Sequence, residues 1–440
     1  MSDKSIWIAK GWVIAGAVSS AFVLTGQAQA AAFKLQEQSV RATGRAFSGE
    51  VADTGPESLW WNPAAIGGMS SSQAYFGITP ILPRATSTDT GTVVLRPGQS
   101  PTGVGGASSQ RNPVNDGVLP AGGFAIPLSD RLAIGLVATS PFSFTTEYAA
   151  DSWARYGADT TKLRTYDLQP SIAFVPVPGL SIGAGLNIEY VRATLSNKLP
   201  DPISPLLPDA EQTLKGNGWD VGYSAGIQYR SHLIDLGLSY KSAIKHKLTG
   251  DFAIAGNQNP VLASIINRSI DGVHADFSTP WQLTAGARLH VTDRLTINGE
   301  FTRTGWDKFD AIRLSAPLST AIPENYKNAN SYALGFDYLV SPKLTIRGGV
   351  QRDLSPIIAG YRDPRVPDGN RWNFAVGSSY AVSSRFTVDL AASYDKIQSA
   401  QIDKIEVAYA GTPLQTVTLT SGQLHNARAL VFGVGGRWNF

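Results

Sequence analysis

The sequence contains no cysteine. A chain without cysteine has no disulfide bond, no thiolate metal ligand and no thiol nucleophile. Charged residues are also sparse, at 16% of the chain, and the formal net charge is only +3. Such a small net charge gives no support to nucleic acid as a partner. The chain also lacks any run of about 18 consecutive apolar residues, the usual minimum for a transmembrane helix, so helical spans are excluded.

Residues 1–30 have the pattern of a secretory leader. Lys4 and Lys10 make its start positive, residues 11–24 are apolar, and Ala28-Gln29-Ala30 form a small-residue cleavage site. The alternative is an uncleaved anchor helix, but the apolar run is shorter than the ~20 residues that span a bilayer. We therefore predict that residues 1–30 are removed and that the mature chain starts at Ala31.

From residue 73 onward, apolar and polar residues alternate with a period of two. Leu180, Ile182 and Ala184, for example, alternate with Ser181 and Gly183. This alternation puts apolar side chains on one face of a strand and polar side chains on the other. The pattern predicts fourteen strands, near residues 73–81, 119–128, 131–148, 164–175, 181–195, 219–229, 233–249, 280–290, 295–306, 331–338, 344–353, 371–380, 386–397 and 427–440.

Three features favour a membrane barrel over a soluble sandwich. Aromatic residues gather near strand ends, as in the girdles of outer-membrane barrels. Short turns alternate with long loops such as 82–118 and 196–217, which matches the two ends of such barrels. The chain ends in a strand with Phe440 on its apolar face, the usual end of bacterial outer-membrane barrels. We predict an all-β fold, a 14-stranded antiparallel transmembrane β-barrel over residues 73–440. The expected partners are outer-membrane lipid, lipopolysaccharide and, through Phe440, the barrel-assembly machinery.

Residues 31–72 do not alternate. They are rich in small residues, carry single charges such as Arg41 and Arg45, and contain Asn62-Pro63-Ala64. Asn is a good N-cap and Pro is favoured at the first helical position, so a short helical turn is expected at this motif. About eight strands leave a bore that side chains fill, whereas about sixteen leave a water channel. A barrel of intermediate width is either an open pore or is blocked, and we predict that residues 31–72 block it. The alternative is that the motif is only a capped turn leading into the first strand.

Several short motifs follow one another along the mature chain. They are Ala31-Ala32-Phe33-Lys34-Leu35, Gly44-Arg45-Ala46-Phe47-Ser48-Gly49-Glu50, Asn62-Pro63-Ala64, Thr145-Thr146-Glu147-Tyr148, Leu214-Lys215-Gly216-Asn217-Gly218-Trp219, Ser239-Tyr240-Lys241-Ser242 and Leu430-Val431-Phe432-Gly433. In this order they resemble the long-chain fatty acid transporter family (FadL/TodX type) of Gram-negative outer membranes. The resemblance covers the whole mature chain. It implies a fourteen-stranded barrel with an N-terminal hatch, and passive uptake of long-chain fatty acids or aromatic hydrocarbons.

The resemblance also implies positions for the ligand. Phe33 maps to an aromatic residue near the high-affinity pocket, and Leu35 lies beside it in the chain. Asn62, Pro63 and Ala64 map to the hatch motif, as a gate or an anchor. In the family, the ligand first meets an apolar groove between two outer loops. The residues here that fit one side of this groove are Leu199, Ile203, Leu206 and Leu207.

The third strand is the expected place of a sideways exit. In the family it carries an inward kink, and the corresponding residues here are Pro141, Phe142, Ser143 and Phe144. Pro141 donates no ladder hydrogen bond, so a break is physically reasonable, although other members place Gly in this stretch. Some members hold the carboxylate with a basic side chain. The nearest candidates are Arg192 and Lys327, and the alternative is that both are ordinary lumen or loop charges.

Two other function classes are alternatives. A general or substrate-selective diffusion porin shares the barrel but has no hatch, and its constriction usually shows opposed charge clusters. Inward charges such as Arg288, Arg347 and Asp389 are spread thinly along this sequence. A barrel enzyme needs a nucleophile with a base, and none of the five histidines stands in a recognisable Ser/His/Asp arrangement. We predict a monomeric non-enzyme that acts on hydrophobic small molecules without metal or cofactor.

Overall fold

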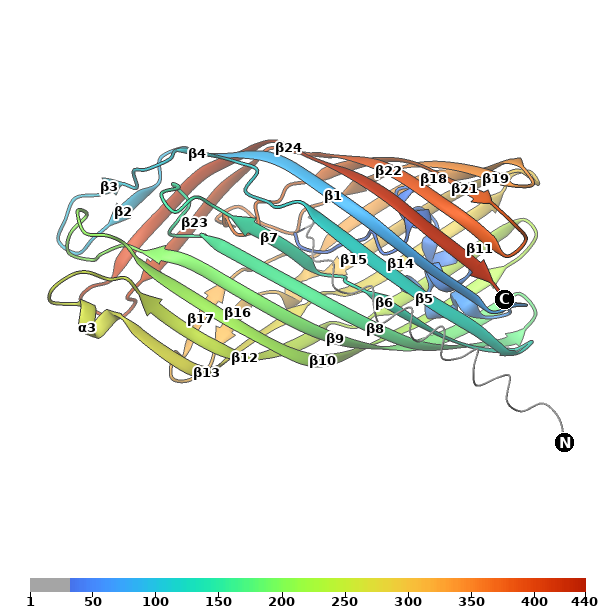
Figure 1. Ribbon diagram of the computed structural model, residues 1–440, viewed down its shortest axis with the longest axis horizontal. Coiled ribbons are helices and arrows are strands. Elements are labelled where there is room, and N and C mark those ends of the chain that lie inside the picture. Colours follow the sequence, from blue (N-terminus) through green and yellow to red (C-terminus); the bar gives the residue numbers. More distant parts are fainter. Residues whose placement is uncertain (1–31) are drawn as a thin grey trace.

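Fourteen long antiparallel strands close into a barrel in the computed structural model, which describes residues 32–440 (Figure 1). The predicted leader and its cleavage site lie outside the described residues. β1 (Gln73–Asp89) pairs with β24 (Thr416–Asn439), so the first and last strands leave no free edge. The fourteen-stranded barrel predicted from the alternation is confirmed. In order, the other wall strands are β5 (Gly117–Ser129), β6 (Leu132–Thr139) continued by β7 (Ser143–Glu147), β8 (Thr160–Val177), β9 (Leu180–Leu199), β10 (Ala210–Arg230), β11 (Ile234–Lys241) continued by β12 (Ile244–Ala255), β13 (Arg268–Thr279) continued by β14 (Trp281–His290), β15 (Leu295–Gly305), β18 (Ala329–Ser341), β19 (Leu344–Asp353), β21 (Arg371–Ala381) and β22 (Phe386–Ile397).

The two ends of the barrel differ. Short turns join the strands at the end where the C-terminus lies, and long loops join them at the other end (Figure 1). Long loops mark the outer end of such barrels and short turns the periplasmic end. Within residues 32–440, no helix is long and apolar enough to cross a membrane. The long loops contain β2 (Val93–Leu95), β3 (Thr102–Gly103), β4 (Ser109–Arg111), α3 (Ala263–Ile266), β16 (Ala311–Leu314), β17 (Thr320–Pro323), β20 (Tyr361–Arg362) and β23 (Ala400–Ala408).

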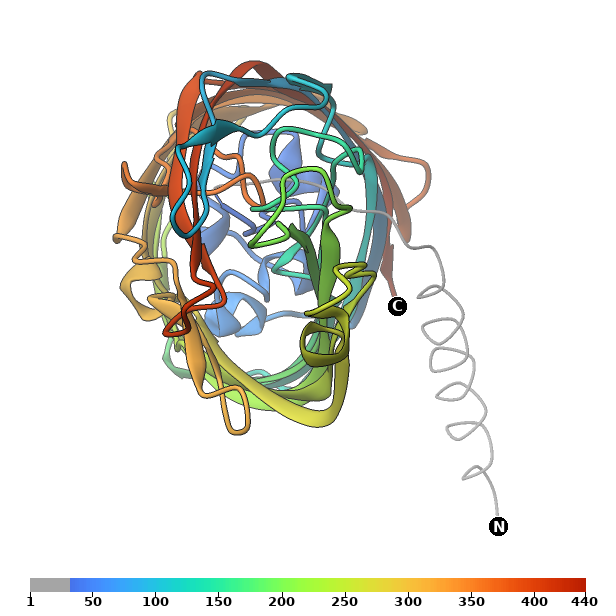
Figure 2. The same ribbon diagram turned by 90° about the vertical axis from the view of Figure 1, so that its left-hand side faces the viewer.

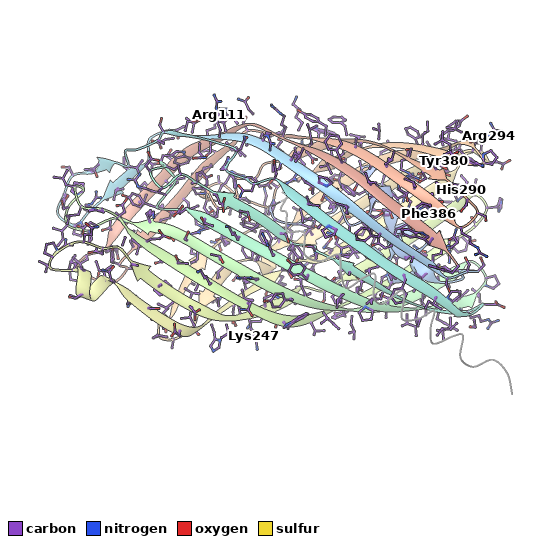
Figure 3. All side chains as sticks on the ribbon, in the orientation of Figure 1. Arg111, Lys247, His290, Arg294, Tyr380 and Phe386 are labelled. Carbon is purple, nitrogen blue, oxygen red and sulfur yellow. The ribbon has the colours of Figure 1, made fainter. Side chains whose placement is uncertain are left out.

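Alternation gives the wall two unlike faces. Leu186 on β9 and Val221 on β10 point outward and are 53% and 63% exposed, whereas Asn187 and Ser224 are buried on the inner face. Side chains stand out all along the outside of the barrel (Figure 3). The apolar outer face suits contact with lipid, and the polar inner face needs partners inside the bore.

Residues 32–72, which we call the N-terminal segment, lie inside the barrel. Figure 2 shows this blue segment within the ring of strands, and nearly all of its residues are buried. It contains α2 (Val40–Thr43) and three 3-10 turns: η1 (Glu50–Ala52), η2 (Pro56–Ser58) and η3 (Pro63–Ile66). The Asn62 side chain accepts a hydrogen bond from the Ala64 N–H at 2.9 Å, with Pro63 at the first position of η3. The helical turn expected from Asn62-Pro63 is therefore present.

Several predicted strand bounds were too short. The first strand extends to Asp89, the last begins at Thr416, and the predicted loop 196–217 shrinks to residues 200–209 because β9 and β10 continue into it. Outside the hydrocarbon layer a strand needs no apolar outward face. The alternation therefore fades there while the hydrogen-bonded ladder continues.

Candidate ligand-binding site

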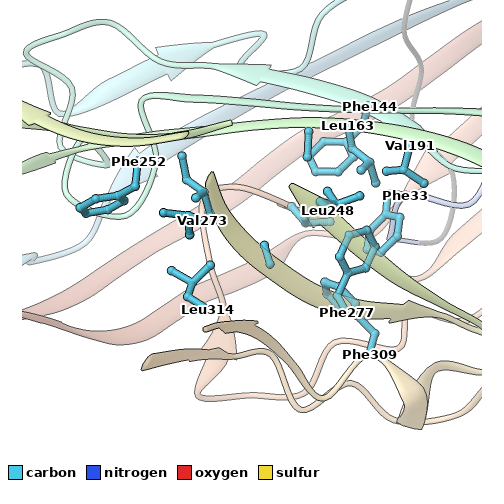
Figure 4. Packing of buried hydrophobic residues seen from close by; sticks show 14 of the residues in the cluster. Phe33, Phe144, Leu163, Val191, Leu248, Phe252, Val273, Phe277, Phe309 and Leu314 are labelled. Atoms are coloured by element: carbon cyan, nitrogen blue, oxygen red, sulfur yellow. The ribbon is translucent and has the colours of Figure 1, made fainter. Parts of the chain in front are cut away.

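An apolar cavity lies inside the barrel toward the long loops. Its empty volume is about 730 Å³, including the part open to solvent. Figure 4 shows Phe33 among Leu163, Leu248, Phe277 and Phe309. Part of its lining consists of inward-facing apolar side chains of neighbouring wall strands: Leu163, Ala193, Leu195, Leu214, Leu248, Val273, Ala275 and Phe277.

Phe33, at the start of the N-terminal segment, closes one side of this cavity. Its ring is 1% exposed and lies in a cage of other aromatic rings. Ring centroids lie 4.8 Å away at Trp306, 5.1 Å at Phe309 and 5.7 Å at Phe144. Aromatic pairs at these separations attract one another beyond simple burial. The cage therefore holds the beginning of the mature chain against the cavity.

The chain around Phe33 is also hydrogen-bonded to the break between β6 and β7. The Leu35 N–H donates to the Pro141 carbonyl at 2.8 Å, and the Ser143 N–H donates to the Phe33 carbonyl at 3.1 Å. These bonds make a short antiparallel bridge between Lys34 and Phe142. The first residues of the N-terminal segment thus act as a small extra strand at the position of the expected kink.

The barrel wall is interrupted at the same place. β5 and β6 are paired up to Gly122 and Ala138, and toward the outer end the next contact is the bridge between Val114 and Thr146. Between these points, residues 117–121 of β5 pair only with β1. The bend that follows Thr139 contains Pro141, which has no N–H to donate. The N-terminal segment therefore occupies bonding positions that a continuous third strand would offer to β5.

A charged cluster forms the other end of the cavity, where Glu324, Asp363 and Arg365 are among its lining residues. The Lys404 ammonium donates to Asp363 at 2.6 Å and to Glu324 at 3.4 Å. The Arg365 guanidinium donates to neutral oxygens of Thr161 at 3.2 Å, Ser196 at 3.3 Å and Asn197 at 2.9 Å. Among residues 32–440, no carboxylate forms an ion pair with Arg365, although its side chain is buried.

Two carboxyl groups near this cluster have pKa values close to neutrality. Burial raises the pKa of Glu324 to about 7, with Lys404 lowering it in part. Burial also raises the pKa of Glu406 to about 7. Both residues lie in the outer loops, Glu324 directly after β17 and Glu406 in β23. Small changes around neutral pH therefore change the charge next to Arg365.

The apolar residues expected in an outer groove are divided between two places. Leu199 ends β9 and is buried in the apolar core around the cavity. Ile203, Leu206 and Leu207 lie in the outer loop 200–209, where Ile203 is 48% and Leu206 91% exposed. The loop is tied to its neighbours because Gln99 donates to the Ile203 carbonyl at 2.6 Å. Leu35 lies apart from the cavity, in a buried cluster with Ile81, Leu119, Ala429 and Val431.

The two expected basic residues lie outside the cavity. Arg192 is exposed on the outer face of β9, because Val191 and Ala193 point inward and alternation turns Arg192 outward. Lys327 is exposed in the loop before β18. Arg365 is the arginine that lines the cavity. Reasoning from the sequence missed it because it lies in an irregular loop with no periodic pattern.

The Asn62-Pro63-Ala64 motif lies against the wall, away from the cavity. Asn62 donates to the Val51 carbonyl at 2.8 Å and to the Ile227 carbonyl of β10 at 3.2 Å. The Ser181 hydroxyl of β9 donates to the Ala64 carbonyl at 2.8 Å. These contacts tie η3 to β9 and β10.

Charges that are far apart in the sequence meet inside the bore. Arg45 of the N-terminal segment contacts Glu50 at 2.5 Å, Asp53 at 2.6 Å and Asp337 of β18 at 2.8 Å. The network continues through wall residues Arg288, Arg347, Asp389 and Arg437, and Arg437 contacts Glu57 at 3.1 Å. The expectation that inward charges are spread thinly is therefore wrong, because in the folded chain these charges form one connected network. The N-terminal segment supplies partners that collect them.

Three comparisons place these features among known proteins. The family model for outer membrane protein transport proteins (OMPP1/FadL/TodX) matches residues 21–440. The Long-chain fatty acid transport protein of Escherichia coli is 26% identical over 450 residues, covering 93% of this chain and 96% of that protein.

Two solved structures share the fold. A Pseudomonas aeruginosa FadL homologue has a TM-score of 0.79 at 22% identity, covering 93% of this chain and all of the other. The Ralstonia pickettii toluene transporter TbuX has a TM-score of 0.62 at 17% identity, covering 90% of this chain and 97% of the other.

Proposed function

Because the chain belongs to the family of outer membrane protein transport proteins (OMPP1/FadL/TodX), we propose that it carries long-chain fatty acids inward past its N-terminal segment. Membership of this family makes it an outer-membrane protein that transports hydrophobic compounds. The fatty acid, the plugging role of the N-terminal segment and the sideways exit form the proposal.

The observation that carries the fatty acid proposal is Arg365 at the end of an apolar cavity. Transfer of an alkyl chain out of water gains ~0.8 kcal/mol for each CH₂ group. A carboxylate at the end of that chain would give the Arg365 guanidinium the ionised acceptor that its neutral partners do not supply. A hydrocarbon such as toluene has no group for this position. The name of the Escherichia coli relative agrees with this choice of ligand.

The route begins at the outer loops. Ile203 and Leu206 expose apolar side chains beside the solvent, and an alkyl chain leaving water would contact them first. The cavity lined by Leu163, Leu214 and Leu248 follows as a better-buried site. Movement from one to the other needs no energy source, because each step removes more alkyl surface from water.

The exit that we propose is the interrupted wall beside Pro141. Phe33 separates the cavity from this break, and two backbone hydrogen bonds hold Phe33 and Leu35 on it. Each such bond contributes only ~1 kcal/mol net. A ligand tail that replaces the Phe33 ring in its aromatic cage would leave only these two bonds to hold the break, and the lipid phase lies directly outside it.

Only the first residues of the N-terminal segment need to move in this mechanism. Arg45, Asp53 and Glu57 tie the rest of the segment to the wall through buried ion pairs, and removing one partner of a buried pair costs ~3–5 kcal/mol. The body of the segment thus keeps the bore closed to water while residues 33–35 shift.

Uptake into cells that lack their own fatty acid transporter tests the proposal. Radiolabelled oleate and toluene are supplied to cells that express this chain, and initial rates are compared with those of cells carrying an empty vector. We expect faster entry of oleate and little change for toluene. Faster entry of toluene alone would replace the fatty acid by an aromatic hydrocarbon, and no gain for either ligand would overturn the proposal.

A general diffusion porin is the competing function. Purified protein in a planar bilayer distinguishes it, because an open bore gives a large ohmic conductance. We expect only brief, rare openings, since the N-terminal segment fills the bore. A steady large conductance would favour the porin.

A further inference from the structure

The outer faces of β8, β9 and β10 carry an ordered set of lateral rows. One row is apolar, with Leu168, Ile188 and Val221 in register across the three strands. The next row toward the outer end is aromatic, and Tyr166, Tyr190 and Trp219 lie side by side with ring centroids 6.4 Å and 5.0 Å apart. An aromatic row next to an apolar band marks the boundary between hydrocarbon and head groups.

The next row outward is basic. Arg164 of β8 lies directly opposite Arg192 of β9, and Asn217 of β10 continues the row. Lys215 lies one row further out on β10, and Lys247 lies on the adjacent β12, where Figure 3 shows it projecting from the barrel. We call Arg164, Arg192, Lys215 and Lys247 the basic face. Within the described part of the chain, none of these four residues forms an ion pair with an acidic side chain.

The acidic neighbours of the basic face offset part of the charge of the two lysines but leave the two arginines uncompensated. Glu147 forms an ion pair with Lys162 at 2.7 Å, and Asp276 forms one with Lys245 at 3.2 Å. Asp251 lies opposite Lys215 and Asp276 lies opposite Lys247, so each offsets part of the charge of one lysine. Nothing comparable faces the two arginines. Like charges directly opposite each other on paired strands destabilise a sheet, so an external anion would relieve this pair.

We propose that the basic face binds the phosphate groups of lipopolysaccharide in the outer leaflet. The anion has to sit at head-group depth, just beyond the aromatic row, and it has to come from the side of the long loops. Lipopolysaccharide supplies sugar-linked phosphates at that depth together with acyl chains for the apolar row. Arginine is well suited to phosphate because its planar donors bind two oxygens at once.

The basic face is the reverse side of the ligand cavity wall. Leu163, Ala193, Leu214 and Leu248 line the cavity, and each is the chain neighbour of one basic residue. Successive side chains of a strand point to opposite faces, so the wall separates the cavity from the two arginines, whereas Lys215 also borders the cavity. The bound lipopolysaccharide therefore lies against the strands that hold the cavity open.

The test uses full-length mature protein in detergent, native mass spectrometry and diphosphorylated lipid A as the probe. The test variant is Arg164→Gln/Arg192→Gln. A charge-keeping variant, Arg164→Lys/Arg192→Lys, and a matched pair in periplasmic turns, Arg131→Gln/Arg294→Gln, serve as controls. A juxtamembrane cation strengthens binding to anionic lipid about fivefold, so the test variant should bind lipid A about thirtyfold more weakly. The turn control should bind within about threefold of wild type, and the charge-keeping variant should bind more tightly than the test variant but less tightly than wild type.

Three further probes separate the possible anions. Dephosphorylated lipid A, phosphatidylglycerol and inorganic phosphate should each bind weakly and without dependence on the two arginines. Equal binding of lipid A by wild type and test variant would overturn the proposal, as would equal binding of phosphatidylglycerol or of the dephosphorylated form. Heat-dependent gel mobility checks that each variant is folded. Oleate affinity in detergent without lipid A should be unchanged in the test variant, so the two proposals fail independently.

Discussion

Replacing Gly183 with alanine should loosen the N-terminal segment inside the barrel. Gly183 lies on β9 and faces the bore, where an added Cβ would lie 2.3 Å from the carbonyl carbon of Pro63 and 2.4 Å from the nitrogen of Ala64. Ordinary Cβ contacts begin at 3.4 Å, so something must move by 3.4 − 2.3 = 1.1 Å. Both atoms are backbone, so a rotamer change of a neighbouring side chain does not relieve the clash.

The size of the effect follows from the bonds at this contact. The Ser181–Ala64 and Asn62–Ile227 hydrogen bonds, at 2.8 Å and 3.2 Å, hold η3 on β9 and β10. A shift of this size takes both beyond bonding distance, and each contributes ~1 kcal/mol net. Losing both bonds shifts the equilibrium between attached and detached η3 by ~2 kcal/mol. This shift makes the fraction of time with η3 detached about thirtyfold larger.

Single-channel recording in planar bilayers measures that fraction. Gly183→Ala should open about thirtyfold more often than wild type, and cells that express it should admit a bulky hydrophilic antibiotic more readily. Gly299→Ala is the matched control, because no atom lies within 4 Å of its added Cβ. If Gly183→Ala stays as closed as Gly299→Ala, η3 does not seal the bore at β9 and the proposed plug is wrong.

Three further predictions concern the cavity. Arg365→Gln should weaken oleate binding at least tenfold, because a hydrogen bond to a charged group contributes ~1.5–3 kcal/mol. The same variant should leave the binding of oleyl alcohol unaffected. If calorimetry shows equal losses of affinity for both ligands, Arg365 has a purely structural role. Phe33→Ala should weaken both ligands by about tenfold or more, since a buried Phe contributes ~1.5–3 kcal/mol of apolar contact, and unchanged affinities would remove Phe33 from the site. Lowering the pH from 8 to 6 should strengthen oleate binding, because Glu324, with a pKa of about 7, becomes neutral while an aliphatic carboxylate with an ordinary pKa of about 4.3 stays charged. Glu324→Gln should flatten this pH profile, and a profile that keeps its slope in the variant would contradict the assignment.

Strand number and closure could be predicted from the sequence because the membrane enforces the pattern. Within the hydrocarbon layer every outward position must be apolar, so the alternation around Leu180 to Leu186 is unbroken. The outer ends of β1, β10 and β24 were not predicted, because strand residues outside the hydrocarbon layer need not be apolar on the outward face. The break at Pro141 was predictable because proline lacks the donor that a ladder needs.

The charged groups of the site could not be predicted in the same way. Arg192 is an exception, because it continues the alternating row of Leu186, Ile188 and Tyr190, which places it outside the bore. Arg365 stands in a loop between prolines, and its position depends on contacts with Thr161 and Asn197, which are far away in the sequence. Arg45 pairs with Asp337, which lies 292 positions away in the sequence. No rule based on neighbouring residues in the sequence links such partners.

The fastening of the N-terminal segment imposes an order on biogenesis. Arg45 and Glu57 are made and exported first, yet they bind Asp337 on β18 and Arg437 on β24, the last strand of all. Until β24 is in place, Glu57 lacks its wall partner Arg437, and a carboxylate without a partner is costly to bury. The segment therefore settles into the bore only as the barrel closes around it, and the final pairing of β1 with β24 completes the wall and fixes the plug in a single event.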